Sequence, residues 1–599
     1  MLADYQYSMP KRSPFTAMKM LALLFCAALA SCSALKTVSG LPASGAATQG
    51  EHIEQLPDAS IGIAEKKAVE RAFEPETLYN LLIGELSVYN RDVRTAATFY
   101  HREAIRTRDP QVVSRAARLA RYLRDAEMAV ELAELWYEVE PDEPRAADNL
   151  ADLYARSGRT SRALDILEAQ MHGGQPARFG ILRNNTLAAG SEELAEVLRR
   201  LENLSARAGK DNFSLLFTHA LLLQKNGDNA AALKQIQRLR GVDSDPVQIA
   251  IIESQLQAEL GNDKAATAVL RKALRKNPDD RNLTLAYARK LTKTDLPRAE
   301  KIFAELLENT PDDVTLLKSH ALVAAENGNF ERAIGSLQTL LDINREKSFA
   351  HYNLGLIAEA RQDSEAALGF YEQVRPGDYF LGATQKLATL LSDRGQQQQA
   401  RDYLASLRVN HPRQATQFWK MEADLLAARE DLNEAQRVLG RAIAQHPNDN
   451  ELRFERSVLS EKLDDLDLVE YDLRYVLARE PNNPIALNAL GYILADRTTR
   501  YAEALQLIEK ALALKPGDPA IMDSLGWAQY KLGRNQQALE NLQQAYAKFP
   551  DDEIAAHLIE VYWRMGQRGK AKAVYKQIRK QSKKHPLSDK TMQRLQLAP

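Results

Sequence analysis

The sequence predicts an all-α protein in which helical hairpins follow one another as a solenoid. Three observations carry this prediction. Pro447, Pro481, Pro516 and Pro550 recur at spacings of 34, 35 and 34 residues, and small residues recur at fixed offsets between them. The 599-residue chain has 45% hydrophobic and 27% charged residues, which is ordinary for a soluble protein. A period of this length indicates stacked helix pairs rather than a globular core around a pocket.

Residues 1–31 have the pattern of an export signal. Basic residues, including Lys19, precede an apolar run from Met20 to Ala30. About 20 apolar residues are needed to span a bilayer, so this run is too short. A basic flank, a short apolar core and small residues after it are typical of a secretory signal.

The run ends in Leu29-Ala30-Ser31-Cys32, which resembles the bacterial lipobox. The resemblance implies that Cys32 is lipidated and becomes the first residue of the mature protein. Residue 33 is Ser rather than Asp, which in Gram-negative lipoproteins implies sorting to the outer membrane. We therefore expect a lipid-anchored protein of the outer membrane that faces the periplasm. The alternative is an ordinary cleaved signal with an incidental cysteine.

Residues 32–60 are rich in Ser, Gly, Ala, Thr and Pro and predict a flexible tether, because they cannot bury enough apolar surface to fold. Residues 61–76 follow as a predicted N-terminal helix. This helix either caps the repeats or docks on a partner. We expect docking, because Gly84 begins a full repeat that another helix need not cap.

From about residue 77 the hairpin pattern begins, with repeats over 77–171, a divergent stretch at 172–210 and a further array over 211–580. Small residues let two helices approach closely, larger apolar residues fill the space to the next hairpin, and proline ends the unit. The clearest copy is Gly526, Gly533, Ala538, Leu542, Ala545 and Pro550. Other copies contain Gly491, Ala504 and Ile508, then Gly355, Ala367 and Tyr371, and Gly84, Ala96 and Tyr100.

These copies resemble tetratricopeptide repeats. The resemblance implies a right-handed superhelical solenoid, and the similarity covers about 13–15 helix pairs. The related Sel1-type repeat has a longer period and more glycine, so it fits less well.

Four aromatic residues fall at repeat positions that face the concave surface of a tetratricopeptide superhelix. Aromatic side chains in a groove are expected partner anchors. The alternative is that they pack on adjacent helices or on the C-terminal segment. The predicted partner-binding residues are Tyr492, Trp527, Tyr530 and Trp563.

The chain ends in a basic stretch. Nine Lys or Arg and no Asp or Glu occur between Arg564 and Lys584, and residues 581–599 form the predicted tail. A solvated terminal cap and a contact with anionic polymer or headgroups are both compatible with this composition.

Catalytic, metal and cofactor motifs are missing from the sequence. It contains no His-Glu-x-x-His, Gly-x-Ser-x-Gly or Gly-x-x-x-x-Gly-Lys pattern. The only cysteines are Cys26 and Cys32, so no cysteine-based metal site is expected in the folded body. Acidic pairs such as Asp464-Asp465 and Asp551-Asp552 are expected helix caps. The net charge of −1 gives no electrostatic attraction to nucleic acid. We expect neither catalytic residues nor a cofactor.

Two segments carry a more specific resemblance. The stretch from Ala486 to Tyr492, which continues through Leu494 to Tyr501, and the stretch from Asp523 to Trp527 are similar to the large tetratricopeptide-repeat lipoproteins of gammaproteobacteria. The best-known member partners the periplasmic carboxy-terminal processing protease. The resemblance implies a non-catalytic adaptor that binds this protease and presents cell-wall hydrolases to it. The alternatives are a scaffold for another envelope machine, such as a pilus, a polysaccharide exporter or a peptidoglycan synthase, and, third, an enzyme.

Overall fold

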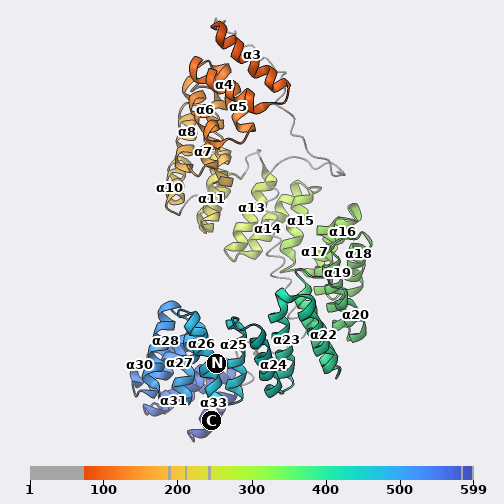
Figure 1. The fold of residues 1–599 in the computed structure, drawn as a ribbon, viewed down its shortest axis with the longest axis vertical. Helices are drawn as coiled ribbons and strands as arrows, with labels where there is room; N and C mark the ends of the chain where they lie inside the picture. Colours follow the sequence, from red (N-terminus) through yellow and green to blue (C-terminus); the bar gives the residue numbers. More distant parts are fainter. Residues whose placement is uncertain (1–72, 186–190, 210–211, 241–244, 582–584, 597–599) are drawn as a thin grey trace. The chain divides into compact units, whose positions relative to one another are not determined.

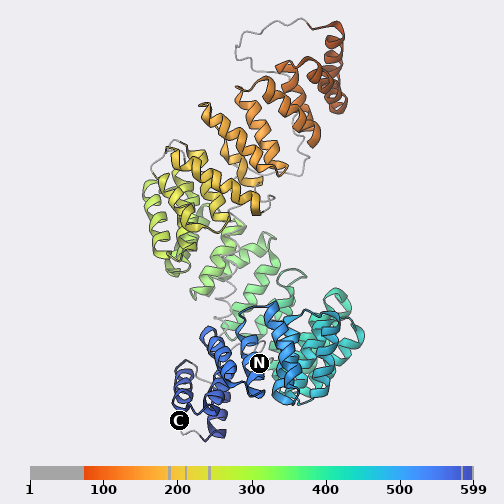
Figure 2. The ribbon, with the colours of Figure 1, turned by 90° about the vertical axis from the view of Figure 1, so that its left-hand side faces the viewer.

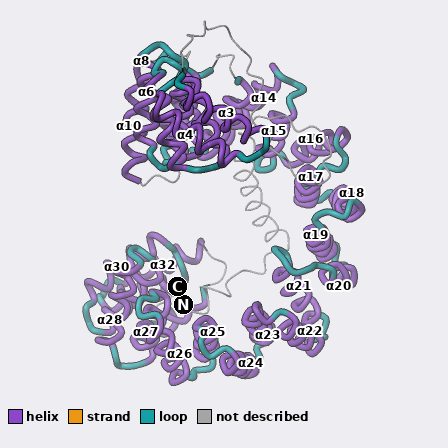
Figure 3. Tube along the Cα trace, turned by 45° about the horizontal axis from the view of Figure 1, so that its top comes forward, coloured by secondary structure: helices purple, strands orange, loops and turns teal. Residues whose placement is uncertain are grey.

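The computed structural model describes residues 73–185, 191–209, 212–240, 245–581 and 585–596 (Figure 1). The export signal, the lipobox at Cys32, the tether and residues 61–72 lie outside the described residues. In the described part, helices alternate with short loops and there is no strand, as Figures 2 and 3 show. The described residues up to Asn327 form one compact unit and those from Gly328 form another.

The first unit begins with the hairpins expected at its N-terminal end and then passes through a divergent stretch. Its elements are α3 (Pro75–Tyr89), α4 (Val93–Thr107), α5 (Pro110–Tyr122), α6 (Ala126–Val139), α7 (Pro144–Arg156), α8 (Thr160–His172), a 3-10 turn (Phe179–Ile181), α9 (Leu182–Asn185), α10 (Ser191–Arg207), α11 (Phe213–Lys225), α12 (Asn229–Arg238), α13 (Pro246–Glu259), α14 (Asp263–Lys276), α15 (Arg281–Leu291), α16 (Leu296–Asn309) and α17 (Val314–Glu326).

The second unit is a regular series of helices. Its elements are α18 (Phe330–Asp342), α19 (Lys347–Ala360), α20 (Ser364–Glu372), α21 (Phe380–Asp393), α22 (Gln397–Asn410), a 3-10 turn (Pro412–Gln414), α23 (Ala415–Ala428), α24 (Leu432–Gln445), α25 (Asn450–Lys462), α26 (Leu466–Arg479), α27 (Pro484–Arg497), α28 (Tyr501–Leu514), α29 (Pro519–Lys531), α30 (Asn535–Lys548), α31 (Asp552–Arg564), α32 (Arg568–Gln581) and α33 (Pro586–Arg594).

The helices follow one another in pairs. Six pairs lie within the first unit and seven within the second. The expected number of 13–15 helix pairs is therefore confirmed for the described residues. None of the described helices is long and apolar enough to cross a membrane.

The recurrent prolines lie where the sequence places them, just past the second helix of a hairpin. Helices α24, α26, α28 and α30 end at Gln445, Arg479, Leu514 and Lys548. Each is followed two residues later by Pro447, Pro481, Pro516 or Pro550. Proline has no backbone N–H and cannot continue a helix interior, so it fixes this boundary.

The small residues mark points of close helix approach. A Cβ atom added at Gly84 would lie 2.9 Å from the ring of Tyr100, and one added at Gly526 would lie 2.6 Å from Cγ of Leu542. These are the residue pairs that the repeat pattern brings together across a hairpin. The core of each unit is built from such contacts between neighbouring helices.

The acidic pairs at the turns are caps only in part. Asp465 and Asp551 accept backbone N–H groups at the starts of α26 and α31, as expected. Asp464 instead has a left-handed backbone, with φ of 61°, and pairs with Arg497. Asp552 accepts the backbone N–H groups of Leu587 and Ser588, at 2.8 and 3.1 Å, so it caps α33.

Candidate partner-binding face

The candidate site lies on the first helices of the last three hairpins, α27, α29 and α31. We define the aromatic–carboxylate cluster as the six residues that these helices bring together in the second unit. They are Tyr492, Asp496, Asp523, Trp527, Glu553 and His557. Tyr492 and Trp527 occupy one repeat position, and Asp523 and His557 occupy another. Asp496 and Glu553 each lie one helical turn from a member of these pairs.

Trp527 is the centre of the cluster. Its ring stacks on His557 of the next hairpin, with 4.0 Å between ring centroids and 18° between planes. Its Nε1–H donates to the carboxylate of Asp496, at 3.0 Å, on the preceding hairpin. The side chain is 5% exposed. Trp527 therefore joins three consecutive hairpins through one buried side chain.

Tyr492 reaches farther along the array. Its hydroxyl donates to Glu553, which lies 61 residues later and two hairpins away. Tyr492 is also buried. Burial raises the pKa of Tyr492 well above its usual range, and the nearby carboxylate of Glu553 raises it further. The tyrosine therefore stays neutral and serves as a hydrogen-bond donor.

Asp523 and His557 form a buried pair. Nδ1 of His557 lies 3.0 Å from Oδ1 of Asp523. Burial alone would lower the pKa of His557, but the Asp523 carboxylate outweighs it and raises the pKa. Burial also raises the pKa of Asp523. The pair thus holds one proton more tightly than the two groups would hold it in water.

Tyr530 and Trp563 are more accessible than the two central aromatic residues. The ring of Tyr530 stacks on Trp527 with 5.2 Å between centroids, and its hydroxyl donates to Glu560 at 3.3 Å. Trp563 lies near the end of α31 and is partly exposed. The guanidinium of Arg568 lies 4.3 Å from the Trp563 ring centroid. Tyr530 therefore borders the buried cluster, whereas Trp563 lies beside the core at the end of the array.

The structure brings three of the four predicted residues, Tyr492, Trp527 and Tyr530, into one contact network. Trp563 packs beside the neighbouring core at the end of the array. Sequence reasoning did not identify Asp496, Glu553 or the Asp523–His557 pair as members of the site. One signal in the sequence could have indicated them. Polar residues recur at one position of successive repeats, as Asn488, Asp523 and His557, and the structure buries all three.

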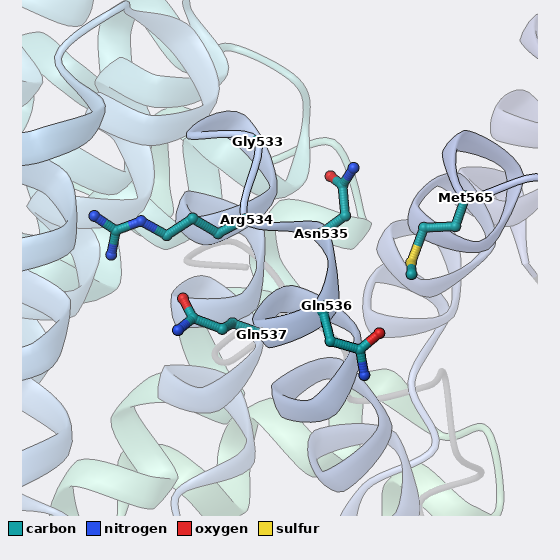
Figure 4. A pocket seen from close by; sticks show the side chains of 6 residues that line it. All are labelled: Gly533, Arg534, Asn535, Gln536, Gln537 and Met565. Atoms are coloured by element: carbon teal, nitrogen blue, oxygen red, sulfur yellow. The ribbon is translucent and has the colours of Figure 1, made fainter.

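A second feature of this region is an open hollow at the turn between α29 and α30. It is lined by Gly533, Arg534, Asn535, Gln536, Gln537 and Met565. In Figure 4, Asn535, Gln536 and Met565 border the same open space, whereas Arg534 and Gln537 point away from it. No aromatic residue or carboxylate lines this hollow, so it offers fewer anchoring groups than the cluster. The described residues contain no group of three or more His, Cys, Asp or Glu that could hold a metal ion.

Comparison with family models identifies tetratricopeptide repeats in both units. The matches cover residues 217–281, 289–348, 318–379, 420–468, 472–519 and 529–595. The last two matches include α27 and α31, whereas most of α29, with Asp523 and Trp527, lies between them.

Comparison with known proteins finds a relative that matches most of this chain. The chain is 35% identical over 517 residues to the TPR repeat-containing protein PA4667 of Pseudomonas aeruginosa, which is 85% of this chain and 87% of the relative. Among solved structures, it is similar to yeast Tom70, with 12% identity, a TM-score of 0.33 and coverage of 87% of this chain and 95% of that one. It is also similar to a chain of the Naa15/Naa10 complex bound to HypK-THB, with 14% identity, a TM-score of 0.37 and coverage of 87% and 90%.

Proposed function

This chain belongs to the family of tetratricopeptide repeat proteins that includes the Pseudomonas aeruginosa relative, and on that premise we propose that it is a non-catalytic adaptor anchored in the outer membrane. The repeats make it a scaffold for protein–protein interaction. The adaptor binds a periplasmic carboxy-terminal processing protease and presents cell-wall hydrolases to it as substrates.

The observation that supports this proposal most directly is where the cluster lies in the sequence. Tyr492, Asp496, Asp523 and Trp527 fall within the two segments that resemble the protease-associated lipoproteins. These residues lie on two hairpins, and their contacts with Glu553 and His557 extend the cluster to a third. Aromatic residues dominate binding energy at many interfaces, so we expect a partner to bind here, through the accessible ring of Tyr530 beside the cluster and that of Trp563 farther along the array.

Reconstitution with purified proteins tests the adaptor role. The mature chain is expected to capture the purified protease and to accelerate its cleavage of a cell-wall hydrolase. Neither the chain alone nor the chain with a bystander protease should cleave the substrate. Cleavage by the chain alone, or absence of both capture and acceleration, would overturn the proposal. Capture of pilus, polysaccharide-export or peptidoglycan-synthesis proteins instead of the protease would favour the other scaffold role.

The membrane anchor has its own test. Cys32→Ala is expected to abolish metabolic lipid labelling and to release the protein from membranes, while the helix content measured by circular dichroism is unchanged. Multiple acyl chains give stable anchoring, so a variant without them should lose membrane binding completely rather than in part. Unchanged labelling, or a variant that stays membrane-bound after a high-salt wash, would contradict this assignment. Ser33→Ala serves as the control with the cysteine intact.

A further inference from the structure

The first helix of the first unit, α3, exposes more large apolar side chains than any other described helix. Five of its 15 residues are large, apolar and exposed, whereas no other described helix has more than one such residue. Spacings of three and four residues place them on one side of α3, opposite the side that packs on α4. We define the α3 stripe as these five residues, which are Leu78, Tyr79, Leu82, Leu86 and Tyr89.

The stacking of hairpins does not account for all of this stripe. Helices α3 and α5 both begin with proline, which fixes the alignment of the first two hairpins. Counted from these prolines, Tyr79 and Leu86 correspond to Ser114 and Arg121 of α5. Ser114 is half-buried and Arg121 is exposed. Apolar side chains are therefore not needed at these positions to build the array, so the stripe indicates a contact outside it.

The carboxylates beside the stripe are already paired within the chain. Glu85 accepts hydrogen bonds from Arg115, at 3.1 and 3.2 Å, and one from the Tyr100 hydroxyl. Glu76 accepts a hydrogen bond from Arg106, at 3.0 Å. Burying an unpaired charge is costly, whereas a paired and hydrogen-bonded one loses less when water is excluded. Another protein surface can therefore cover the stripe without leaving these carboxylates unpaired.

The spacing of the stripe is the same in both directions along the helix. Tyr79, Leu82, Leu86 and Tyr89 follow one another at intervals of three, four and three residues. These are the intervals between core positions of a coiled coil. The midpoint of the four residues is residue 84. A second α3 that runs antiparallel about this midpoint therefore places its Tyr89 opposite Tyr79 and its Leu86 opposite Leu82. A two-fold axis repeats both contacts, so the stripe is complementary to itself.

The stripe is large enough for a weak dimer. Its five side chains are 52–86% exposed, so covering them removes roughly 500 Å² from each copy and about 1,000 Å² in all. This area is at the lower end of the range for specific interfaces, so we expect a dimer that forms reversibly. Antiparallel packing also puts the positive N-terminal end of each α3 beside the negative C-terminal end of the other.

We propose that α3 is a dimerisation helix, on which the α3 of a second copy of this chain docks antiparallel through the α3 stripe. The dimer carries two aromatic–carboxylate clusters, so it can bind a partner that has two equivalent sites more tightly than one copy can. This inference goes beyond the proposed adaptor role and does not depend on it, because dimerisation is measured without the protease.

Sedimentation over a range of concentrations tests the dimer. The mature chain carrying Cys32→Ser is expected to be monomeric when dilute and dimeric as its concentration rises. Leu82→Asp places an unpaired carboxylate in the interface twice and should weaken dimerisation by about 100-fold or more, while circular dichroism shows unchanged helix content. Val409→Asp, at an isolated exposed apolar residue of α22, is the matched control and should leave dimerisation unchanged.

Two results of this experiment would overturn the proposal. One is a chain that stays monomeric at every concentration, as it would if another segment of the same chain or a different protein covers α3. The other is a dimer that is equally stable with Leu82→Asp, because its interface would then lie elsewhere.

Disulfide trapping tests the antiparallel register independently. Tyr79→Cys and Tyr89→Cys are introduced into separate samples of the Cys32→Ser chain, which are then mixed in equal amounts under mild oxidation. We expect disulfides between the two variants, because the register places residue 79 of one copy opposite residue 89 of the other. Tyr79→Cys alone is the control, since about 15 Å along the helix axis separates its two symmetry-related cysteines. Equal trapping in the mixture and in the control, or no trapping in either, would contradict the antiparallel dimer.

Discussion

Gly526 shows, at the scale of one residue, how closely two helices approach in a hairpin. A methyl group there would lie 2.6 Å from Cγ of Leu542 and 3.1 Å from the carbonyl oxygen of Ala538. Both neighbours are buried, and the carbonyl belongs to the backbone, so neither yields easily. We therefore expect Gly526→Ala to destabilise the second unit by about 1–3 kcal/mol, measured as a lower denaturation midpoint.

The matched control is Gly335→Ala in the same unit. No heavy atom outside its own helix backbone lies within 4 Å of a methyl group added there. Alanine is the better helix former by about 1 kcal/mol, so this substitution should be neutral or slightly stabilising. If Gly526→Ala and Gly335→Ala lowered the denaturation midpoint equally, close packing would not be the reason for glycine at residue 526.

The Asp523–His557 pair makes the second unit sensitive to pH. The pKa of His557 is raised in the folded protein, although burial opposes this, because the Asp523 carboxylate stabilises the imidazolium. A raised pKa means that the folded state binds the proton more tightly than the unfolded state. The stability gained is fully present below the unfolded pKa of 6.5 and is lost as pH rises through the folded value. The pKa of Asp523 is also raised, by burial, so its ionisation likewise lowers stability as pH rises.

Melting temperatures over about pH 5.5 to 9 would measure this effect. We expect the melting temperature of the unsubstituted chain to fall as pH rises above 6.5, relative to His557→Gln, which cannot titrate in this range. Glu553 and Asp496 also face the histidine and help to raise its pKa, so the pH dependence that His557→Gln removes includes their attraction for the imidazolium. Parallel pH profiles would contradict the prediction.

At the scale of the element, α33 depends on a cap from another helix. The Asp552 carboxylate accepts two backbone N–H groups at the start of α33, and Arg594 near its end pairs with Glu560. Because α33 has only nine residues, it cannot be stable without these contacts. Asp552→Ala should cost about 1 kcal/mol and lower hydrogen-exchange protection over residues 586–594.

Lys590→Ala is the control for this prediction. Lys590 lies in the same helix with its side chain exposed, so its removal should leave exchange unchanged. If both substitutions leave protection intact, the cap does not hold α33 in place. The basic composition of this region is therefore compatible with a folded end of the array, while contact with an anionic polymer stays a prediction.

At the scale of the whole molecule, buried and accessible aromatic residues should have separable roles. Trp563 is partly exposed, so Trp563→Ala should weaken binding of the proposed protease partner by about 2 kcal/mol and leave the melting temperature nearly unchanged. Trp527 is buried and joins three hairpins, so Trp527→Ala should cost about 3–5 kcal/mol of stability.

Affinity and melting temperature measured on the same samples separate these two roles. Binding titrations would use only the folded fraction at low temperature. Loss of stability without loss of affinity in Trp563→Ala would place that residue among the packing residues. Loss of affinity with unchanged stability in Trp527→Ala would make it the anchor instead.

Much of the hairpin pattern was predictable because it is local. Pro447, Pro481, Pro516 and Pro550 each lie just past a second helix. Glycine or alanine is needed where two helices nearly touch, as Gly84 and Tyr100 show. Which helix each Asp of the acidic pairs caps was less predictable. Asp465 caps its own helix, whereas Asp552 caps a helix 35 residues later, and the two look alike in the sequence.

The sequence by itself determined the fold class, the period and the hairpin boundaries, since each hairpin contacts mainly its neighbours and repeats the same requirements. The tertiary structure decided which side chains meet across hairpins. Tyr492 contacts Glu553 two hairpins away, and Trp527 lies between Asp496 and His557. These contacts depend on the small rotation between successive repeats, which brings equivalent positions together or apart and which the repeat period does not specify.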